Sequence, residues 1–208
     1  YVKAGASALV TGELQQEPAE DTNFRSMVVQ AASAIGDTSI AVTLGGTAVT
    51  ADQFAGGDLL VESSTGIGQS FKIKTHDVQT STTGTCIFNV DRPVKIALTT
   101  SSQVSVRRNS YVQVIQFPIT PTGKPLGVAL LALTAAQFGW VQSGGDGVAL
   151  FDTGVNTSAD VTGIMPSRDV AGSVSPAAAA DVSPNYIGFA KEQVSVDSTM
   201  GFVHLTID

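Results

Sequence analysis

Hydrophobic and polar positions alternate in short runs along almost the whole chain. In residues 39–44 every second position is hydrophobic, at Ile40, Val42 and Leu44. A period of two places these side chains on one face of a strand and the polar side chains on the other. Further strand-like runs, separated by Gly, Asp, Asn, Ser or Pro, occupy residues 58–62, 69–74, 85–90, 147–151 and 160–166. The pattern predicts an all-β fold of antiparallel sheets with one solvent-exposed face.

Helix signals are confined to two short segments. Thr50 is a suitable N-cap for a single helical turn, which Gly56 and Gly57 would end. Residues 177–180 are four alanines, but the flanking prolines, Pro176 and Pro184, restrict them to a loop or one turn. No helix longer than about three turns is expected.

A spaced self-similarity marks the second half of the chain. Residues 126–129 precede the aromatic-rich segment 138–142, and about 60 residues later 187–190 precede 200–204 in the same way. Each block has the pattern of a strand, a bend and a second strand, with glycines that permit close backbone approach. The blocks predict two related hairpins in one antiparallel β-barrel or sandwich over residues 119–208. The aromatic side chains assigned to its core are Phe138, Trp140, Phe189 and Phe202.

Three prolines within eight residues, Pro118, Pro121 and Pro125, interrupt the strand pattern. Proline removes a ladder donor and favours an extended connection, so a domain boundary is expected here. The expected domains are an N-terminal β-domain, residues 1–117, and a C-terminal barrel or sandwich, residues 118–208.

Charge is scarce in this sequence. Charged residues make up 14% of the chain and the formal net charge is −7. The only adjacent basic pair is Arg107–Arg108, so the basic face that nucleic-acid phosphates require is not expected. No apolar stretch is long enough for a membrane helix and no signal peptide is visible, which predicts synthesis in the cytoplasm without a membrane partner. Cys86 is the single cysteine and excludes an intrachain disulfide.

No catalytic, cofactor-binding or metal-binding residues are predicted. His76 and His204 have no further His or Cys at ligand spacing. Asp146 resembles one fragment of a calcium loop, but the later ligands are missing, and a β-turn explains it. Asp152–Gly154 matches the aspartic-protease triplet, but such enzymes need two of these carboxylates.

Three other motifs favour structural roles. Gly66–Gly68 begins like a phosphate-binding loop but joins two predicted strands, which indicates a hairpin turn. Asn156–Ser158 matches a glycosylation acceptor, which without a secretory signal indicates a polar turn. Trp140, the only tryptophan, is assigned to the core, with an interface role as the alternative.

The order of these segments resembles structural proteins encoded in the head gene region of tailed bacteriophages, especially marine ones. The resemblance covers roughly residues 30–208 and rests on structural glycines and hydrophobic residues. The segments that carry it are 34–44, 55–61, 66–76, 91–98, 125–129, 138–142 and 202–208.

The resemblance implies a non-enzymatic virion component, specifically a capsid decoration or cement protein on the outer capsid surface. Its expected partner is the major capsid protein, and the expected assembly is a homo-oligomer, a trimer being one possibility. The alternative is a host- or carbohydrate-binding β-module of a tail or fibre, which requires exposed aromatic side chains in a groove. A hydrolase is a third class, disfavoured because no activated nucleophile or carboxylate pair can be named.

Overall fold

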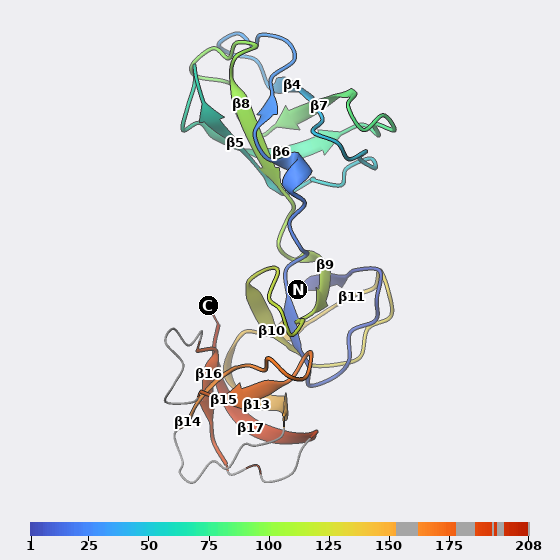
Figure 1. The fold of residues 1–208 in the computed structure, drawn as a ribbon, viewed down its shortest axis with the longest axis vertical. Helices are drawn as coiled ribbons and strands as arrows, with labels where there is room; N and C mark the ends of the chain where they lie inside the picture. The colour runs from blue at the N-terminus through green and yellow to red at the C-terminus, as the bar shows by residue number, and fades with distance from the viewer. Residues whose placement is uncertain (153–161, 178–185, 193, 195–197, 208) are drawn as a thin grey trace. The chain divides into compact units, whose positions relative to one another are not determined.

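The computed structural model describes residues 1–152, 162–177, 186–192, 194 and 198–207. The chain forms two compact units, shown in Figure 1: the first unit comprises residues 1–19 and 110–208, and the second unit comprises residues 20–109. The second unit is therefore an insertion within the first. The boundary expected at residues 117/118 lies inside the first unit instead, because residues 1–19 supply strands that pair with segments beyond residue 110.

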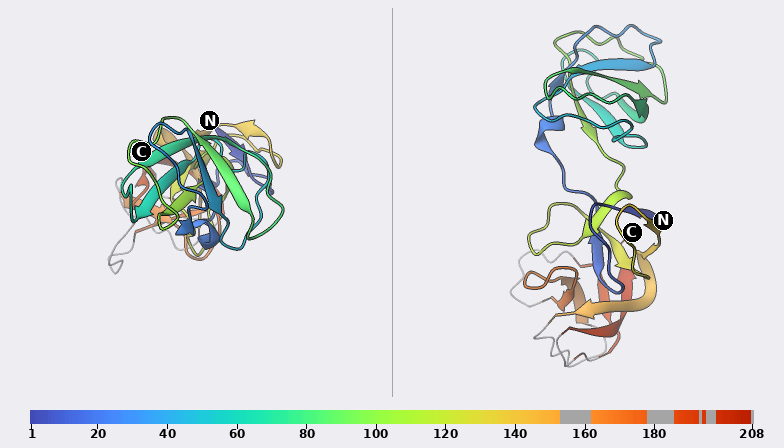
Figure 2. Two further views of the ribbon diagram at one scale, coloured as in Figure 1. Left: turned by 90° about the horizontal axis from the view of Figure 1, so that it is seen from above. Right: turned by 90° about the vertical axis from the view of Figure 1, so that its right-hand side faces the viewer.

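The second unit is a six-stranded sheet in the order β3-β8-β5-β6-β7-β4. An isolated bridge between Val29 and Val42 brings its two ends together around one core (Figures 1 and 2). Its strands are β3 (Met27–Val28), β4 (Ser39–Thr43), β5 (Asp58–Ser63), β6 (Ser70–His76), β7 (Thr85–Val90) and β8 (Gln103–Arg107). The predicted alternation is confirmed: Ile40, Val42 and Leu44 are buried, and exposed or half-buried residues stand between them.

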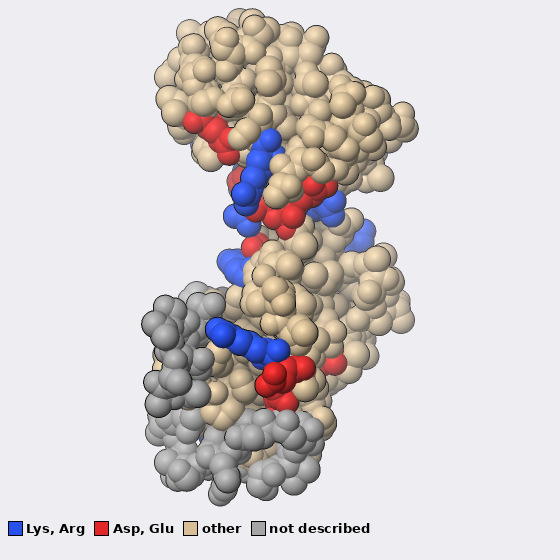
Figure 3. All heavy atoms as spheres, viewed as in Figure 1, with Lys and Arg blue, Asp and Glu red and all other residues tan. Residues whose placement is uncertain are grey.

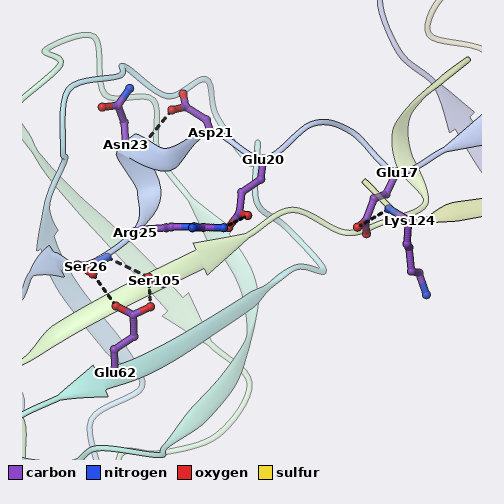
Figure 4. A network of polar contacts seen from close by, with 9 residues as sticks. All are labelled: Glu17, Glu20, Asp21, Asn23, Arg25, Ser26, Glu62, Ser105 and Lys124. Carbon is purple, nitrogen blue, oxygen red and sulfur yellow. Dashed lines mark hydrogen bonds and ion pairs between the residues drawn. The ribbon is translucent and has the colours of Figure 1, made fainter. Parts of the chain in front are cut away.

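The helical turn predicted after Thr50 is not observed. The chain forms turns over residues 51–56 rather than a helical turn, and Asp52 has a φ of 54°. A left-handed residue cannot continue a right-handed helix, which explains the difference. The structure has instead a 3₁₀-helix, Thr22–Phe24, whose N-cap Asp21 accepts a hydrogen bond from the Asn23 amide (Figure 4). Most of the alanine run at 177–180 lies outside the described residues.

The first unit contains two closed sheets, named here the first barrel and the second barrel. The first barrel has the order β11-β1-β9-β2-β10-β12; only Trp140 separates β11 from β12, so the two ends of the sheet are one continuous segment and the sheet closes. Its strands are β1 (Val2–Ala4), β2 (Leu14–Gln16), β9 (Val112–Gln116), β10 (Pro125–Ala129), β11 (Phe138–Gly139) and β12 (Val141–Gln142). The second barrel has the closed order β13-β15-β14-β16-β17. Its strands are β13 (Gly144–Phe151), β14 (Thr162–Pro166), β15 (Val174–Pro176), β16 (Gly188–Ala190) and β17 (Thr199–Thr206).

The two barrels have the same strand pairing. Strands β1, β2, β9, β10 and β11/β12 correspond in order to β13, β14, β15, β16 and β17. One pair is parallel in each barrel, β1 with β9 and β13 with β15, and the other named pairs are antiparallel.

The residue registers of the two barrels agree as well. Matched residue pairs are Val2–Gly139 with Ala149–Gly201, Ala4–Val114 with Phe151–Val174, Gln15–Gly127 with Ile164–Gly188, and Ala129–Val141 with Ala190–Val203. The first unit is thus an internal duplication of one five-stranded barrel.

Backbone conformation supports the duplication at two matched glycines. Gly127 and Gly188 have φ values of 147° and 153°. A Cβ at Gly127 would lie 2.4 Å from the Gln142 carbonyl oxygen, and one at Gly188 would lie 2.0 Å from the His204 carbonyl oxygen. Only glycine permits so close an approach of one strand to the next.

The two predicted hairpins therefore form, but not in one barrel. The hairpin of β10 and β12 belongs to the first barrel, and the hairpin of β16 and β17 belongs to the second. They separate because β10 also pairs with β2, from the start of the chain, whereas β16 pairs with β14. The barrels share part of a core, since Leu14, Phe117 and Val128 pack with the buried residues of the second barrel.

Candidate functional site

Trp140 is 64% exposed, which corrects its assignment to the core. The other three aromatic residues assigned to the core, Phe138, Phe189 and Phe202, are also exposed. The reason lies in the intervening glycines. Gly139 is the inward position of its strand, where a Cβ would lie 2.5 Å from the Leu133 side chain. Because successive side chains alternate across a strand, a glycine inside the barrel places its aromatic neighbours outside.

Three rings form a contiguous cluster on the first barrel, named here the aromatic face: Tyr1, Phe138 and Trp140. The Tyr1 and Phe138 rings are stacked, with centroids 5.5 Å apart and an interplanar angle of 4°. The Trp140 ring meets Tyr1 edge-on at 5.1 Å, and the Lys3 ammonium lies 5.4 Å from the Phe138 centroid. The rings position one another, so the aromatic face offers a preorganised apolar surface.

The positions of the second barrel that match the aromatic face are Val148, Met200 and Phe202, which are exposed and apolar as well. The second barrel also has a cluster of ionisable side chains, named here the charged face: Asp146, Lys191 and His204. The Asp146 carboxylate accepts hydrogen bonds from Lys191 Nζ and, at 2.7 Å, from His204 Nδ1. These two bonds, that of Lys191 first, lower the pKa of the Asp146 carboxyl below its ordinary value. A pocket of about 350 Å³ adjoins this face and is lined by Asp146, Gly147, Lys191, Glu192 and Phe202. His204 therefore lies in a solvent-facing ion cluster, as the alternation on its strand predicts.

The other histidine, His76, is buried in the second unit. Its Nε2 atom accepts a hydrogen bond from the Phe54 amide at 3.0 Å, and its Nδ1 atom lies 3.0 Å from the Asp77 carbonyl oxygen. A carbonyl oxygen can only accept, so Nδ1 carries the proton and the imidazole is neutral. Cys86 Sγ lies 3.7 Å from Nδ1, and burial, followed by the Asp77 charge, raises the pKa of its thiol to about 11. Both side chains serve the core and are poorly suited to nucleophilic chemistry.

The carboxylate motifs have structural partners. Asp152 is buried and accepts a hydrogen bond from the Ser167 hydroxyl, whose oxygen accepts in turn from the Asp169 and Val170 amides. Asp146 is a member of the charged face rather than a simple turn residue. The possible acceptor at 156–158 lies outside the described residues.

The glycine loop at residues 66–68 joins β5 to β6 in an antiparallel pair, so the predicted hairpin turn is confirmed. In the basic pair at residues 107–108, Arg107 is exposed and Arg108 is half-buried. The Arg108 guanidinium lies 5.7 Å from the centroid of Phe54, and desolvation lowers its pKa. Within the part of the chain that the structure describes, no group of three His, Cys, Asp or Glu side chains could hold a metal ion.

Polar contacts fix the ends of the inserted unit. In the second unit the Glu62 carboxylate accepts from the Ser26 and Ser105 hydroxyls, which lowers its pKa, and Glu20 pairs with Arg25 (Figure 4). In the first unit the Lys124 amide donates to Glu17 Oε1 at 3.1 Å. Figure 3 shows that charged side chains cover only a small part of either unit on the face drawn. Most of the described surface on that face is therefore uncharged.

No known protein family, curated protein or solved structure matches this chain. None of the helical segments in the described residues is long and apolar enough to cross a membrane.

Proposed function

We propose that this chain is a non-enzymatic capsid decoration protein of a tailed bacteriophage, bound to the major capsid protein on the outer surface of the head. The observation that carries the proposal is the aromatic face, Tyr1, Phe138 and Trp140, exposed on a rigid β-barrel. Aromatic residues dominate the energetics of protein interfaces, and their few rotatable bonds cost little entropy on binding. The proposed partner, the major capsid protein, is the one implied by the resemblance of residues 30–208 to phage head-region proteins.

The scarcity of charge also supports this role. Desolvating neutral side chains is cheaper than desolvating ions, so a charge-poor surface can be covered at low cost. A capsid lattice repeats its subunits, and a homo-oligomer engages several of them at once. Multivalent attachment then exceeds the affinity of each single contact by about 10² to 10⁴. A net charge of −7 keeps the unbound protein soluble.

The exposed rings also favour a second candidate function, a carbohydrate- or host-binding module of the virion. This alternative requires exposed aromatic side chains in a groove, and the exposure of Tyr1, Phe138 and Trp140 meets the first part of that requirement. Trp140, the most exposed of the three rings, offers an aromatic side chain on which a sugar ring can stack.

Co-sedimentation separates the two functions. Purified protein is mixed with empty heads that lack it, and separately with host-envelope glycans. The decoration proposal predicts saturable pelleting with heads, at a fixed ratio to the major capsid protein. Saturable binding to glycans without binding to heads would instead establish the alternative. Native mass spectrometry gives the oligomeric state in the same preparation.

A further inference from the structure

The second unit has a pocket in which both charged lining residues are basic, named here the basic pocket. It has a volume of about 210 Å³ and is lined by Gly68, Gln69, Ser70, Phe71, Arg92, Pro93 and Lys95. The first four of these residues belong to the glycine loop and β6, and the other three follow β7 in the chain. No carboxylate of the described residues lies within ion-pair distance of Arg92 or Lys95.

Gln69 gives the basic pocket a fixed frame. Its Nε2 atom donates to the Gly66 and Ile96 carbonyl oxygens, at 3.2 and 2.9 Å. Its Oε1 atom accepts hydrogen bonds from the Lys95 and Ile96 amides, at 2.9 and 3.1 Å. Both N–H groups and both lone pairs of the side-chain amide are therefore occupied, and the two segments that line the pocket are held together.

The Arg92 guanidinium is also held in position. Its Nε atom donates to the Ser70 carbonyl oxygen at 3.0 Å, and its Nη2 atom donates to the Ser70 carbonyl and hydroxyl oxygens. Its Cζ atom lies 5.8 Å from the centroid of the Phe71 ring. In the part of the chain that the structure describes, the Nη1 atom has no hydrogen-bond partner. A cation that is already oriented loses less entropy when it binds an anion.

The chain neutralises other cations of the second unit but not these two. Arg25 and Lys72 each pair with a carboxylate. Asp91, which directly precedes Arg92, accepts a hydrogen bond from the Lys72 amide at 2.8 Å. The basic pocket therefore carries positive charge without a counter-charge from the described residues, in a chain whose net charge is −7. An anionic group is the ligand that complements it.

The backbone of the glycine loop does not supply donors for this anion. The amides of residues 67–69 all donate to carbonyl oxygens of the same β5–β6 hairpin. A phosphate-binding loop needs such amides free to point at its ligand. Recognition in the basic pocket therefore depends on the side chains of Arg92 and Lys95.

Two exposed isoleucines indicate what carries the anionic group. Ile67 precedes the lining residue Gly68 and is 64% exposed, and Ile96 follows Lys95 and is 52% exposed. Apolar side chains gain free energy by leaving water against another apolar surface, which a free ion does not provide. Anionic membranes are recognised by clusters of about 4–8 Lys or Arg residues, and nucleic acids by a basic face, so two cations favour a single carboxylate on a protein surface.

We propose that the basic pocket binds the carboxylate of an acidic side chain on a partner protein. Arg92 Nη1 and Lys95 Nζ donate to the carboxylate oxygens, and the two isoleucines contact apolar side chains beside it. The site belongs to the second unit, so it depends neither on the aromatic face nor on attachment to a capsid.

A small probe tests the chemistry of the ligand. Acetyl-aspartate N-methylamide, titrated at about pH 7 where its carboxyl group is ionised, should shift the Lys95 amide and Arg92 Nε–H resonances saturably in the millimolar range. The neutral control, acetyl-asparagine N-methylamide at the same ionic strength, should shift neither. Equal shifts with both probes, or no saturable shift, would overturn the proposal. Binding of inorganic phosphate at least about tenfold tighter would also overturn it, because the pocket would then select phosphate groups.

Two matched variants test the residues. Lys95→Gln removes a charge from the pocket, whereas Lys74→Gln removes the same charge from an exposed position of β6 outside it. Lys95→Gln should bind the aspartate probe at least about threefold more weakly, and Lys74→Gln should bind it as wild type does. Both variants should keep the melting temperature, since each replaces an exposed side chain. Equal weakening by the two variants would show a response to net charge alone, and unchanged binding by Lys95→Gln would remove that residue from the site; either result would contradict the proposal.

Discussion

At the position where the first barrel has Ala4, the second has Phe151, although both residues are buried and both pair with a valine of the neighbouring strand. The space inside each barrel is filled differently. Leu133 lies against Gly139 in the first barrel, whereas Phe151 and Val194 lie against Gly201 in the second. Strand register has been kept while the core side chains have been exchanged. Cores tolerate such exchange when total volume is preserved, but strand register cannot slip without inverting the sheet faces.

The outer surfaces of the two barrels differ as much as the cores. The position of Trp140 is Phe202 in the second barrel, and the exposed Leu130 and Leu131 of the first barrel match Lys191 and Glu192. At the positions of Leu130 and Leu131 the first barrel is thus apolar and the second is charged, whereas Val148, Met200 and Phe202 are exposed apolar residues of the second barrel. Divergence of the exposed positions gives the two barrels surfaces of different composition at these places, although both have the same strand pairing.

The largest predicted effect tests the exchanged core. Phe151→Ala should lower the free energy of unfolding by about 3–5 kcal/mol, because the cavity adjoins Gly201 and Val194 cannot fill it alone. The matched control is Phe202→Ala, the same truncation at an exposed site, with an expected change within about 0.5 kcal/mol. Urea unfolding of both variants measures the difference. Equal losses would mean that the second barrel does not depend on Phe151.

The matched glycines test the shared backbone. Gly127→Ala and Gly188→Ala should each cost about 1–3 kcal/mol, since both combine a positive φ with a Cβ clash against a carbonyl oxygen. Gly145→Ala is the control, with a φ of 79° but nothing within 4 Å of the new Cβ. Thermal melts should show similar shifts for the two matched variants and a smaller shift for the control. If alanine were tolerated at either glycine, the two barrels would not be equivalent at that position.

The strands and hairpins could be predicted from the sequence, whereas the domain boundary and the two barrels could not. Period-two alternation correctly located β4 to β7, because each strand has one buried face. The repeat correctly predicted the two hairpins, β10 with β12 and β16 with β17, but wrongly placed them in one barrel. The predicted domain boundary was wrong, and the division into two barrels was not predicted. Both depend on β1 and β2, which pair with strands more than 100 residues away, and no local pattern encodes such pairing.

Trp140 shows how the aromatic face could have been predicted from the sequence. Phe138-Gly139-Trp140 and Met200-Gly201-Phe202 share an inward glycine, and alternation from that glycine places the large side chains in solvent. The assignment to the core followed hydrophobicity alone and ignored strand phase. The charged face was not foreseen, because Asp146, Lys191 and His204 come from three strand segments whose proximity only the fold reveals.

The smallest predicted effect concerns the charged face and pH. The pKa of Asp146 lies below its ordinary value of 3.8, so the ionised form stabilises the folded chain above that pH, and the contribution is lost as pH falls through the depressed pKa. The effect is small because the pair is exposed and screened. Wild type should therefore lose more thermal stability below about pH 3.8 than Asp146→Asn does. Identical acid profiles would show that the ion cluster contributes nothing to the second barrel.

The most direct test of the account compares Trp140→Ala with Phe202→Ala in binding to empty heads. These two residues hold the same place in duplicated barrels and both are exposed, so neither truncation should change the melting temperature appreciably. The account predicts that Trp140→Ala weakens head binding by at least about tenfold, as loss of a hot-spot aromatic does, and that Phe202→Ala leaves binding nearly unchanged. Full binding by Trp140→Ala, with its fold intact, would contradict attachment through the aromatic face.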